Sequence, residues 1–192
     1  MRALCVVGSP SPGSHTSALV RHVGVLLAER GFEVTVADLG ELELPRSHPD
    51  AYWSEAPHPV PAARDFIAAA RGADALVLGT PVYHAGYSGV LKDALDLLPK
   101  DTFEGKAIGL AANAGGPRGS SVAVEQLRQV VKALGGWPVP EQVCTVASDF
   151  AGRHSLAEAD AIRTRCTAMA DQLVRFTRAM RAGTGAGVRS AA

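Results

Sequence analysis

Residues 3–17 read ALCVVGSPSPGSHTS and combine a short apolar run with a loop of glycine, proline and hydroxyl side chains. The apolar run at 3–7 shows no polar alternation, which is typical of a strand buried on both faces of a sheet. Gly8 ends the run, and Ser14 is a residue type that begins helices by binding a free backbone amide. The segment therefore predicts a strand, a loop and a helix start, the opening unit of a parallel sheet.

The same alternation of apolar runs and amphipathic segments continues along the chain, interrupted by one polar loop at 38–61. We expect strands at 3–7, 32–37, 75–79, 106–112 and 142–147 and helices at 14–30, 61–71, 87–98, 120–134 and 156–181. Strands that alternate with helices run parallel, with right-handed crossovers and helices on both faces. Five strands favour an α/β, flavodoxin-like doubly wound sheet of order 2-1-3-4-5 over a six-stranded dinucleotide-binding fold. We expect one domain at 1–181 and a flexible C-terminal tail at 182–192.

Composition excludes several classes of protein. The 192 residues are 47% hydrophobic and 20% charged, which is ordinary for a folded domain. Basic and acidic residues number 19 each, and a chain without net positive charge is a poor candidate for binding nucleic acid. No apolar run approaches the roughly 20 residues of a membrane span, and there is no signal-peptide pattern. The three cysteines are far apart and form no metal-binding motif, so we expect no metal site and a cytoplasmic location.

The loop after the first strand is predicted to bind an anion. Amides at a helix start are unpaired and lie at the positive end of the helix dipole. Ser9, Ser14 and Thr16 add hydroxyl groups that can donate to phosphate oxygens. Neither the triphosphate P-loop motif nor the GxGxxG dinucleotide fingerprint is present. The alternative is a plain turn in which Ser14 only caps the helix.

The loops after the third and fourth strands lie at the same edge of the predicted sheet, where doubly wound folds bind their ligands. Residues 79–89 contain two tyrosines, His84 and three glycines. Residues 113–119 contain three glycines and one cation, Arg118. Such loops bring backbone amides and an aromatic ring against a flat heterocycle. Together with the anion site, they predict a mononucleotide that carries a large ring system.

Three segments resemble the NADPH-dependent FMN reductase family, which has the flavodoxin-like fold, over roughly residues 2–150. They are GSPSPGSHTSAL at 8–19, GTPVYHAGYSGVLKDALDLLP at 79–99 and NAGG at 113–116. The resemblance implies FMN as the cofactor, with its phosphate held by Ser9, Ser14 and Thr16 and a further contact from His15. It implies that Pro81, Val82, Tyr83 and His84 line the isoalloxazine, and that Asn113, Ala114, Gly115 and Gly116 contact its far side and pyrimidine edge.

The same resemblance implies an oxidoreductase that transfers a hydride from NADPH or NADH to FMN. The flavin carries this chemistry itself, so no catalytic side chain is assigned, and Arg118 is the candidate contact for the nicotinamide nucleotide. One use of the product is to supply reduced FMN to a flavin-dependent monooxygenase. The alternatives are an FMN-containing quinone, azo or metal-ion reductase and a flavodoxin-type electron carrier. The neutral net charge argues against the carrier, because electron-carrier flavodoxins resemble acidic proteins.

Two departures from the family bear on how the flavin is used. Many members carry Arg where this chain has Ser11, which removes a charge near the phosphate or the nicotinamide nucleotide. The helix at 120–134 lacks the additional residue that produces a π-bulge in sulfonate-linked two-component reductases, which favours a retained FMN. The family is commonly oligomeric, and the helix at 87–98 carries more apolar residues than one core-facing stripe requires. We therefore expect a homodimer or homotetramer.

Overall fold

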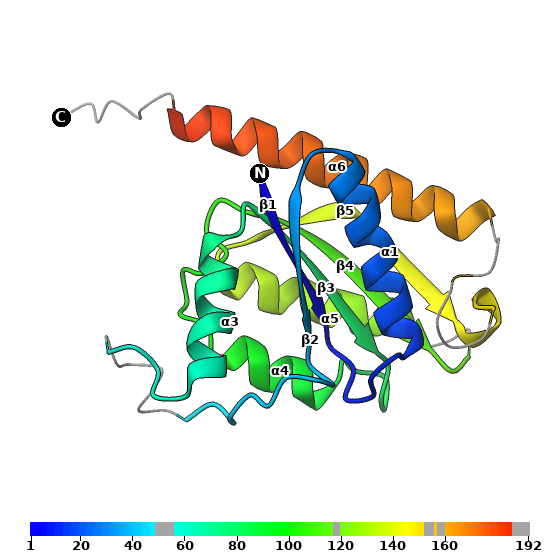
Figure 1. Ribbon diagram of the computed structural model, residues 1–192. Helices are drawn as coiled ribbons and strands as arrows, with labels where there is room; N and C mark the ends of the chain where they lie inside the picture. The colour runs from blue at the N-terminus through cyan, green and yellow to red at the C-terminus, as the bar shows by residue number, and fades with distance from the viewer. Residues whose placement is uncertain (49–55, 117–119, 152–155, 157–159, 186–192) are drawn as a thin grey trace.

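The computed structural model describes residues 1–48, 56–116, 120–151, 156 and 160–185 (Figure 1). Its strands are β1 (Arg2–Val7), β2 (Glu33–Asp38), β3 (Ala75–Pro81), β4 (Ala107–Ala114) and β5 (Trp137–Val146). Its helices are α1 (His15–Glu29), α3 (Pro61–Gly72), α4 (Gly89–Asp96), α5 (Ser120–Ala133) and α6 (Asp160–Gly185), with a short 3-10 turn, η1, at Ala147–Asp149.

The five strands are parallel and lie in the order β2-β1-β3-β4-β5, which confirms the predicted flavodoxin-like sheet. Figure 1 shows α1 and α6 on one face of the sheet and α3, α4 and α5 on the other. An apolar core fills each layer, and alternate residues of β1 contribute to the two cores. Leu4 and Val6 pack on the side of α3, α4 and α5, whereas Cys5 and Val7 pack on the side of α1 and α6. Burial on both faces explains why the strands read as continuous apolar runs.

Helix α1 begins where the sequence predicts and is stopped as expected. Ser14 Oγ accepts a hydrogen bond from Ser17 N at 3.2 Å and caps the helix. Gly31 follows it with a φ of +87°, a left-handed conformation that favours glycine. The helix lies so close to β3 that a Cβ on Gly79 would meet Val20 Cγ2 at 2.1 Å. This packing brings the N-terminus of α1 to the carboxyl edge of the sheet, where ligands bind in this class of fold.

Helix α4 is shorter than the predicted 87–98, because Ser88 Oγ accepts a bond from Leu91 N at 3.2 Å and starts the helix at Gly89. The additional apolar residues of this segment were expected to form an exposed face of the protein, and this expectation is wrong. Its apolar side chains lie in the core of the chain itself, with Val90 half-buried and the others fully buried: Leu91, Ala94, Leu95, Leu97 and Leu98. The segment after β2 also covers this region, since Leu44 packs against the same core and Ser47 Oγ donates to Asp96 O at 2.8 Å.

Strand β5 starts at Trp137, earlier than the predicted 142–147. Two prolines hide its first half in the sequence, because proline lacks the amide that a strand ladder uses. The register against β4 shifts between Ile108 and Leu110. At this irregularity the side chain of Arg128 donates to the carbonyl oxygens of Val139 at 3.1 Å and Pro140 at 3.2 Å. Arg128 therefore provides hydrogen-bond donors to two β5 carbonyl groups beside the irregular register.

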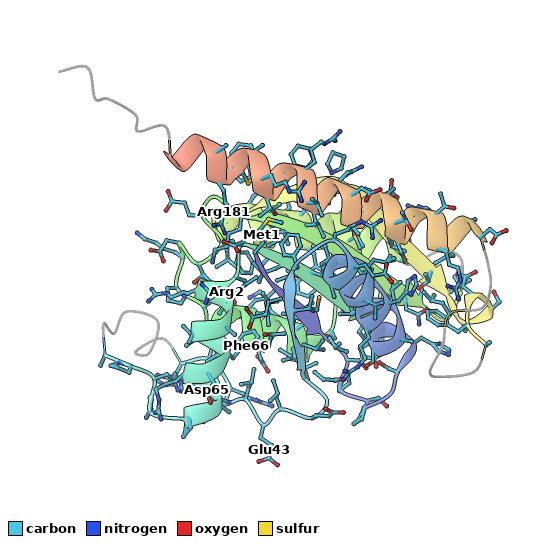
Figure 2. The ribbon with its side chains drawn as sticks, turned by 45° about the horizontal axis from the view of Figure 1, so that its top comes forward. Met1, Arg2, Glu43, Asp65, Phe66 and Arg181 are labelled. Atoms are coloured by element: carbon cyan, nitrogen blue, oxygen red, sulfur yellow. The ribbon has the colours of Figure 1, made fainter. Side chains whose placement is uncertain are left out.

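Helix α6 runs to Gly185, so residues 182–185 of the expected tail are helical, and 186–192 lie outside the described residues. The end of the helix is fastened to the start of the sheet. Arg181 Nη1 lies 2.8 Å from Asp74 Oδ1, and Arg2 N donates to Asp74 Oδ2 at 2.7 Å. Figure 2 shows Arg181 close to Arg2 at this end of the molecule.

The other end of α6 also differs from the prediction, since the helix was expected to begin at Leu156. Leu156 instead pairs with Phe150 in an isolated β-bridge, and residues 157–159 lie outside the described residues. Within the described part of the chain, no helix is both long enough and apolar enough to cross a membrane.

Candidate functional site

A pocket of about 310 Å³ opens at the carboxyl edge of the sheet, between the loops that follow β1, β3 and β4. Its lining residues are Ser9, Ser11, Ser14, His15, Thr16, Pro81, Val82, Tyr83, Asn113 and Gly115. All of them except Ser11 belong to the predicted set. Three other predicted residues, His84, Ala114 and Gly116, are described but do not line this pocket. Arg118 lies outside the described residues.

One end of the pocket gathers groups that can bind an anion. The start of α1 leaves its first amides without helical partners, and they lie at the positive end of the helix dipole. Thr16 is only 1% exposed, and its Oγ1 has no hydrogen-bond partner among the described residues. A buried hydroxyl without a partner is costly, and because Thr16 also lines the pocket, a ligand oxygen there can accept this missing hydrogen bond. No lysine or arginine lies among the described lining residues, so neutral donors form this cradle.

The loop after β1 is joined firmly to the loop after β3. Gly8 N donates to Gly79 O at 2.8 Å, and Ser88 Oγ donates to Gly8 O. Ser88 N in turn donates to Thr80 Oγ1 at 2.9 Å. A Cβ on Gly8 would lie 2.6 Å from Gly79 O. The two loops therefore approach so closely that only glycine fits at position 8. The anion cradle and the wall of the pocket are therefore held as one unit.

Asp38, a buried carboxylate at the end of β2, accepts hydrogen bonds from side chains at the start of α1. Asp38 Oδ2 accepts bonds from Ser17 Oγ and from Arg21 Nη2, both at 3.1 Å. Asp38 Oδ1 accepts a bond from Gly40 N at 3.2 Å. Arg21 balances the negative charge of Asp38. The buried carboxylate therefore does not repel an anion bound at the start of α1.

The loop after β3 carries a tight turn beside the pocket. Tyr83 N donates to Gly86 O at 3.0 Å, and Gly86 N donates to Tyr83 O at 2.9 Å. The two central residues, His84 and Ala85, have φ values of 50° and 62°, which only glycine and asparagine adopt easily. This geometry places the exposed His84 at the tip of the turn and Tyr83 on the pocket wall. The role of His84 as a ring contact stays a prediction.

The loop after β4 supplies the polar wall of the pocket. Asn113 and Gly115 line it, and the side-chain oxygen of Asn113 lies 3.1 Å from Thr145 Oγ1 on β5. Val82 N donates to Asn113 O at 2.9 Å, which joins the walls contributed by β3 and β4. The pocket therefore has an anion cradle at one end and a carboxamide on its side.

Phe150 packs against a residue of the site and was not predicted. Its ring stacks on the imidazole of His15, with 4.4 Å between the ring centroids and 9° between the planes. It comes from the segment after β5, and no glycine, hydroxyl or charge pattern singles that position out. The signal that could have found it is topological: this segment also leaves the carboxyl edge of the sheet.

The three cysteine side chains are poorly suited to act as nucleophiles. Burial raises the pKa of Cys5 to about 12 and that of Cys166 to about 11, and it also raises the pKa of Cys144. Thiols with such pKa values remain protonated and are poor nucleophiles. The described residues contain no group of three or more His, Cys, Asp or Glu side chains that could hold a metal ion.

A parallel sheet of this order, with an anion cradle at a helix start and a pocket at the carboxyl edge, defines a flavodoxin-like mononucleotide-binding protein. A sequence model of the NADPH-dependent FMN reductase family matches residues 1–151, and the chain belongs to this family. It is an oxidoreductase that uses NAD(P)H and FMN.

Individual relatives agree with this assignment. The chain is 37% identical over 180 residues to the FMN-dependent NADPH-azoreductase of Staphylococcus aureus strain USA300, covering 92% of this chain and 95% of that protein. An oxidoreductase structure from Corynebacterium diphtheriae has a TM-score of 0.71 and 26% identity, covering 93% of this chain and 98% of that one. The apo form of an NADH:FMN oxidoreductase shares the fold, with a TM-score of 0.70, 24% identity and coverage of 93% and 89%.

Proposed function

We propose that this enzyme keeps FMN in the pocket between the β1, β3 and β4 loops and passes electrons from NADPH to an azo or quinone-type acceptor. The observation that carries the proposal is the anion cradle, where Thr16, in the first turn of α1, lines the pocket with a buried hydroxyl that has no partner among the described residues. The near full-length similarity to an FMN-dependent NADPH-azoreductase supports the choice of acceptor.

In this proposal each end of the pocket has its own task. Ser9, Ser14, His15 and Thr16 hold the FMN phosphate, and the wall residues Pro81, Val82 and Tyr83 pack on the flavin ring. Asn113 and Gly115 lie at its polar edge. His84 is proposed as a further contact to the flavin ring, Ala114 and Gly116 as contacts to its far side and pyrimidine edge, and Arg118 as the contact for the nicotinamide nucleotide. Bound FMN supplies the redox chemistry by accepting a hydride and returning two electrons. The residues of the chain need only bind the cofactor, orient the substrates and shield the flavin from water.

Retention of FMN is supported by helix α5, which is an α-helix throughout Ser120–Ala133. An unbroken helix here gives firm support to the side of the pocket formed by the loop after β4. Its Gln126 also contacts the turn after β3, because Gln126 Nε2 lies 3.4 Å from Ala85 O. The same helix therefore also contacts the turn after β3 that carries Tyr83.

A second use of FMN is favoured by a different observation. Because the described lining residues include no lysine or arginine, the phosphate would be held by neutral donors and His15 alone. Hydrogen bonds from neutral donors hold a dianion less tightly than ion pairs do. Weak retention would suit an enzyme that reduces FMN and hands it to a flavin-dependent monooxygenase.

We further propose a homodimer or homotetramer whose contact covers the pocket mouth. Tyr83 is 48% exposed on the turn after β3, and Val122 is 43% exposed on α5. The hydrogen bond between Gln126 and Ala85 brings α5 and this turn together, so both side chains belong to one surface. Light scattering at micromolar concentration tests this proposal, and a monomer would contradict it.

The function is tested by anaerobic stopped-flow with the FMN-loaded enzyme. NADPH and NADH are supplied separately, and an azo dye or a quinone follows in a second mixing step. We expect NADPH to bleach the flavin and the acceptor to restore its colour without added FMN. A steady-state rate that rises with free FMN, together with release of reduced FMN, would favour the monooxygenase-supplying alternative.

A further inference from the structure

Ser88, at the start of α4, is hydrogen-bonded to both of the loops that form the two ends of the pocket. Its hydroxyl donates to Gly8 O, and its backbone amide donates to Thr80 Oγ1 at 2.9 Å. Thr80 Oγ1 in turn donates to Pro81 O at 2.8 Å. Ser88 is 1% exposed and Thr80 is 0% exposed, so solvent has little access to these bonds.

The direction of each bond follows from the chemistry of its partners. A carbonyl oxygen can only accept a hydrogen bond, and a backbone amide can only donate one. The Ser88 hydroxyl must therefore donate to Gly8 O, while its oxygen accepts from Leu91 N at 3.2 Å. The Thr80 hydroxyl likewise accepts from Ser88 N and donates to Pro81 O. Both hydroxyl hydrogens are engaged, and neither series of bonds can be reversed.

Both links end beside the residues that line the pocket. Gly8 directly precedes Ser9, which belongs to the anion cradle. Pro81 is itself part of the wall on which the flavin ring is proposed to pack. Among the described residues, Ser88 is the one hydrogen-bond partner of the buried Gly8 carbonyl oxygen. A single buried side chain therefore joins the loop of the cradle to the loop of the ring wall.

We propose that Ser88 is a positioning residue that sets the distance between the anion cradle and the ring wall, and that it thereby makes the pocket prefer FMN to flavins without a phosphate. The proposal rests on the proposed FMN site. A ligand that binds at both ends gains from the second contact only when the two ends are correctly spaced. A flavin without the phosphate uses the ring wall alone and has no such requirement.

Removal of the Ser88 hydroxyl would leave the buried Gly8 carbonyl oxygen without its donor. Such a carbonyl is stabilised by moving toward another donor or toward water, and this movement displaces the loop that begins at Gly8. The bond from Gly8 N to Gly79 O remains, so the strands stay paired while the cradle beyond them shifts. The affinity for FMN should therefore fall, and the affinity for a flavin without the phosphate should change little.

The experiment compares Ser88→Ala with the wild type in their affinities for FMN and for riboflavin, which has the same ring and sugar chain without the phosphate. Fluorescence titration measures both affinities. Thr102→Val is the matched control, because Thr102 is 2% exposed and its hydroxyl donates to Pro99 O at 2.7 Å. Thr102 lies shortly before β4, and hence near the amino edge of the sheet, opposite the pocket.

We expect Ser88→Ala to lower the ratio of FMN affinity to riboflavin affinity about tenfold. Thr102→Val should keep the wild-type ratio. A purely structural role of Ser88, limited to capping α4, would lower stability and leave this ratio unaltered, and that result would overturn the inference while leaving the FMN site intact. A wild-type protein that bound no FMN would instead overturn the proposed function.

The link through Thr80 gives a second test, which covers the case in which Ser88→Ala does not fold. Thr80→Val keeps the shape of the side chain but removes the acceptor for Ser88 N, whereas Thr80→Ser keeps the hydroxyl. We expect Thr80→Val to lower the ratio of FMN affinity to riboflavin affinity and Thr80→Ser to retain it. Equal ratios in these two variants would contradict the inference.

Discussion

The imidazole of His15 lies flat against the ring of Phe150, with the ring centroids 4.4 Å apart. His15 is the first residue of α1, and Phe150 follows the last strand of the sheet. The stack therefore joins the anion cradle to a segment more than a hundred residues away in the chain. It therefore orients a side chain that lines the pocket.

Phe150→Ala should weaken FMN binding, because His15 loses the surface that orients it. An aromatic pair contributes about 0.5–1.5 kcal/mol beyond its area burial, which corresponds to a loss of affinity of up to about tenfold. Phe150→Tyr keeps the ring and should bind FMN as the wild type does. Fluorescence titration gives both dissociation constants, and equal values for Phe150→Ala and wild type would show that the stack does not serve the site.

Thr16→Val should change stability and binding in opposite directions. The empty protein should become more stable by about 1 kcal/mol, because a buried hydroxyl without a partner is removed. FMN affinity should fall by about tenfold or more, because a hydrogen bond to a charged phosphate contributes about 1.5–3 kcal/mol. Urea unfolding without FMN and titration with FMN measure the two effects.

Thr177→Val separates these effects. It also removes a buried hydroxyl without a partner in the described structure, so it should stabilise the protein by a similar amount. Its position on α6 predicts unchanged FMN affinity. Equal FMN affinities for Thr16→Val and Thr177→Val would argue that Thr16 does not contact the phosphate.

Ala85→Gly should stabilise the protein by about 1 kcal/mol, because Ala85 has a φ of 62° and a left-handed alanine costs about 1–2 kcal/mol. Gly31→Ala is the reverse control: this glycine has a φ of +87°, and a Cβ there would touch nothing within 4 Å. It should destabilise the protein by a similar amount. Thermal unfolding measures the stability of both variants. A less stable Ala85→Gly would show that the alanine side chain stabilises the turn by more than its left-handed backbone conformation costs.

Stability should fall as the pH rises above about 8.5, where cysteine thiols of an unfolded chain lose their protons. Burial holds the pKa of Cys5 at about 12 and that of Cys166 at about 11, so the folded protein keeps these protons. The unfolded state then binds fewer protons, and the free energy of unfolding decreases with pH until the folded pKa values are reached. Urea unfolding between pH 7 and pH 10 measures this slope.

The matched variant for that measurement is the double substitution Cys5→Ala and Cys166→Ala. Its slope against pH should be smaller than that of the wild type, even though the lost packing lowers its stability at every pH. Identical slopes would show that other groups cause the alkaline loss of stability.

Local patterns predicted most of what positions the site. The apolar run at 3–7 and the cap at Ser14 are local features, and both lie where the sequence places them. The features that were missed depend on contacts between distant segments. Leu97 and Leu98 are buried by tertiary packing at the end of α4, and Phe150 reaches His15 only through the sheet topology. The early start of β5 was hidden by two prolines, which lack the amide donors of a regular strand ladder.

We propose that this pocket retains FMN and that NADPH reduces it there. The most direct measurement loads the protein with FMN, removes free flavin by gel filtration, and records the visible absorbance before and after anaerobic NADPH. We predict a yellow protein with close to one FMN per chain, bleached by NADPH and recoloured by an azo dye. A colourless protein after gel filtration, whose turnover rises with added FMN up to saturation, would contradict it.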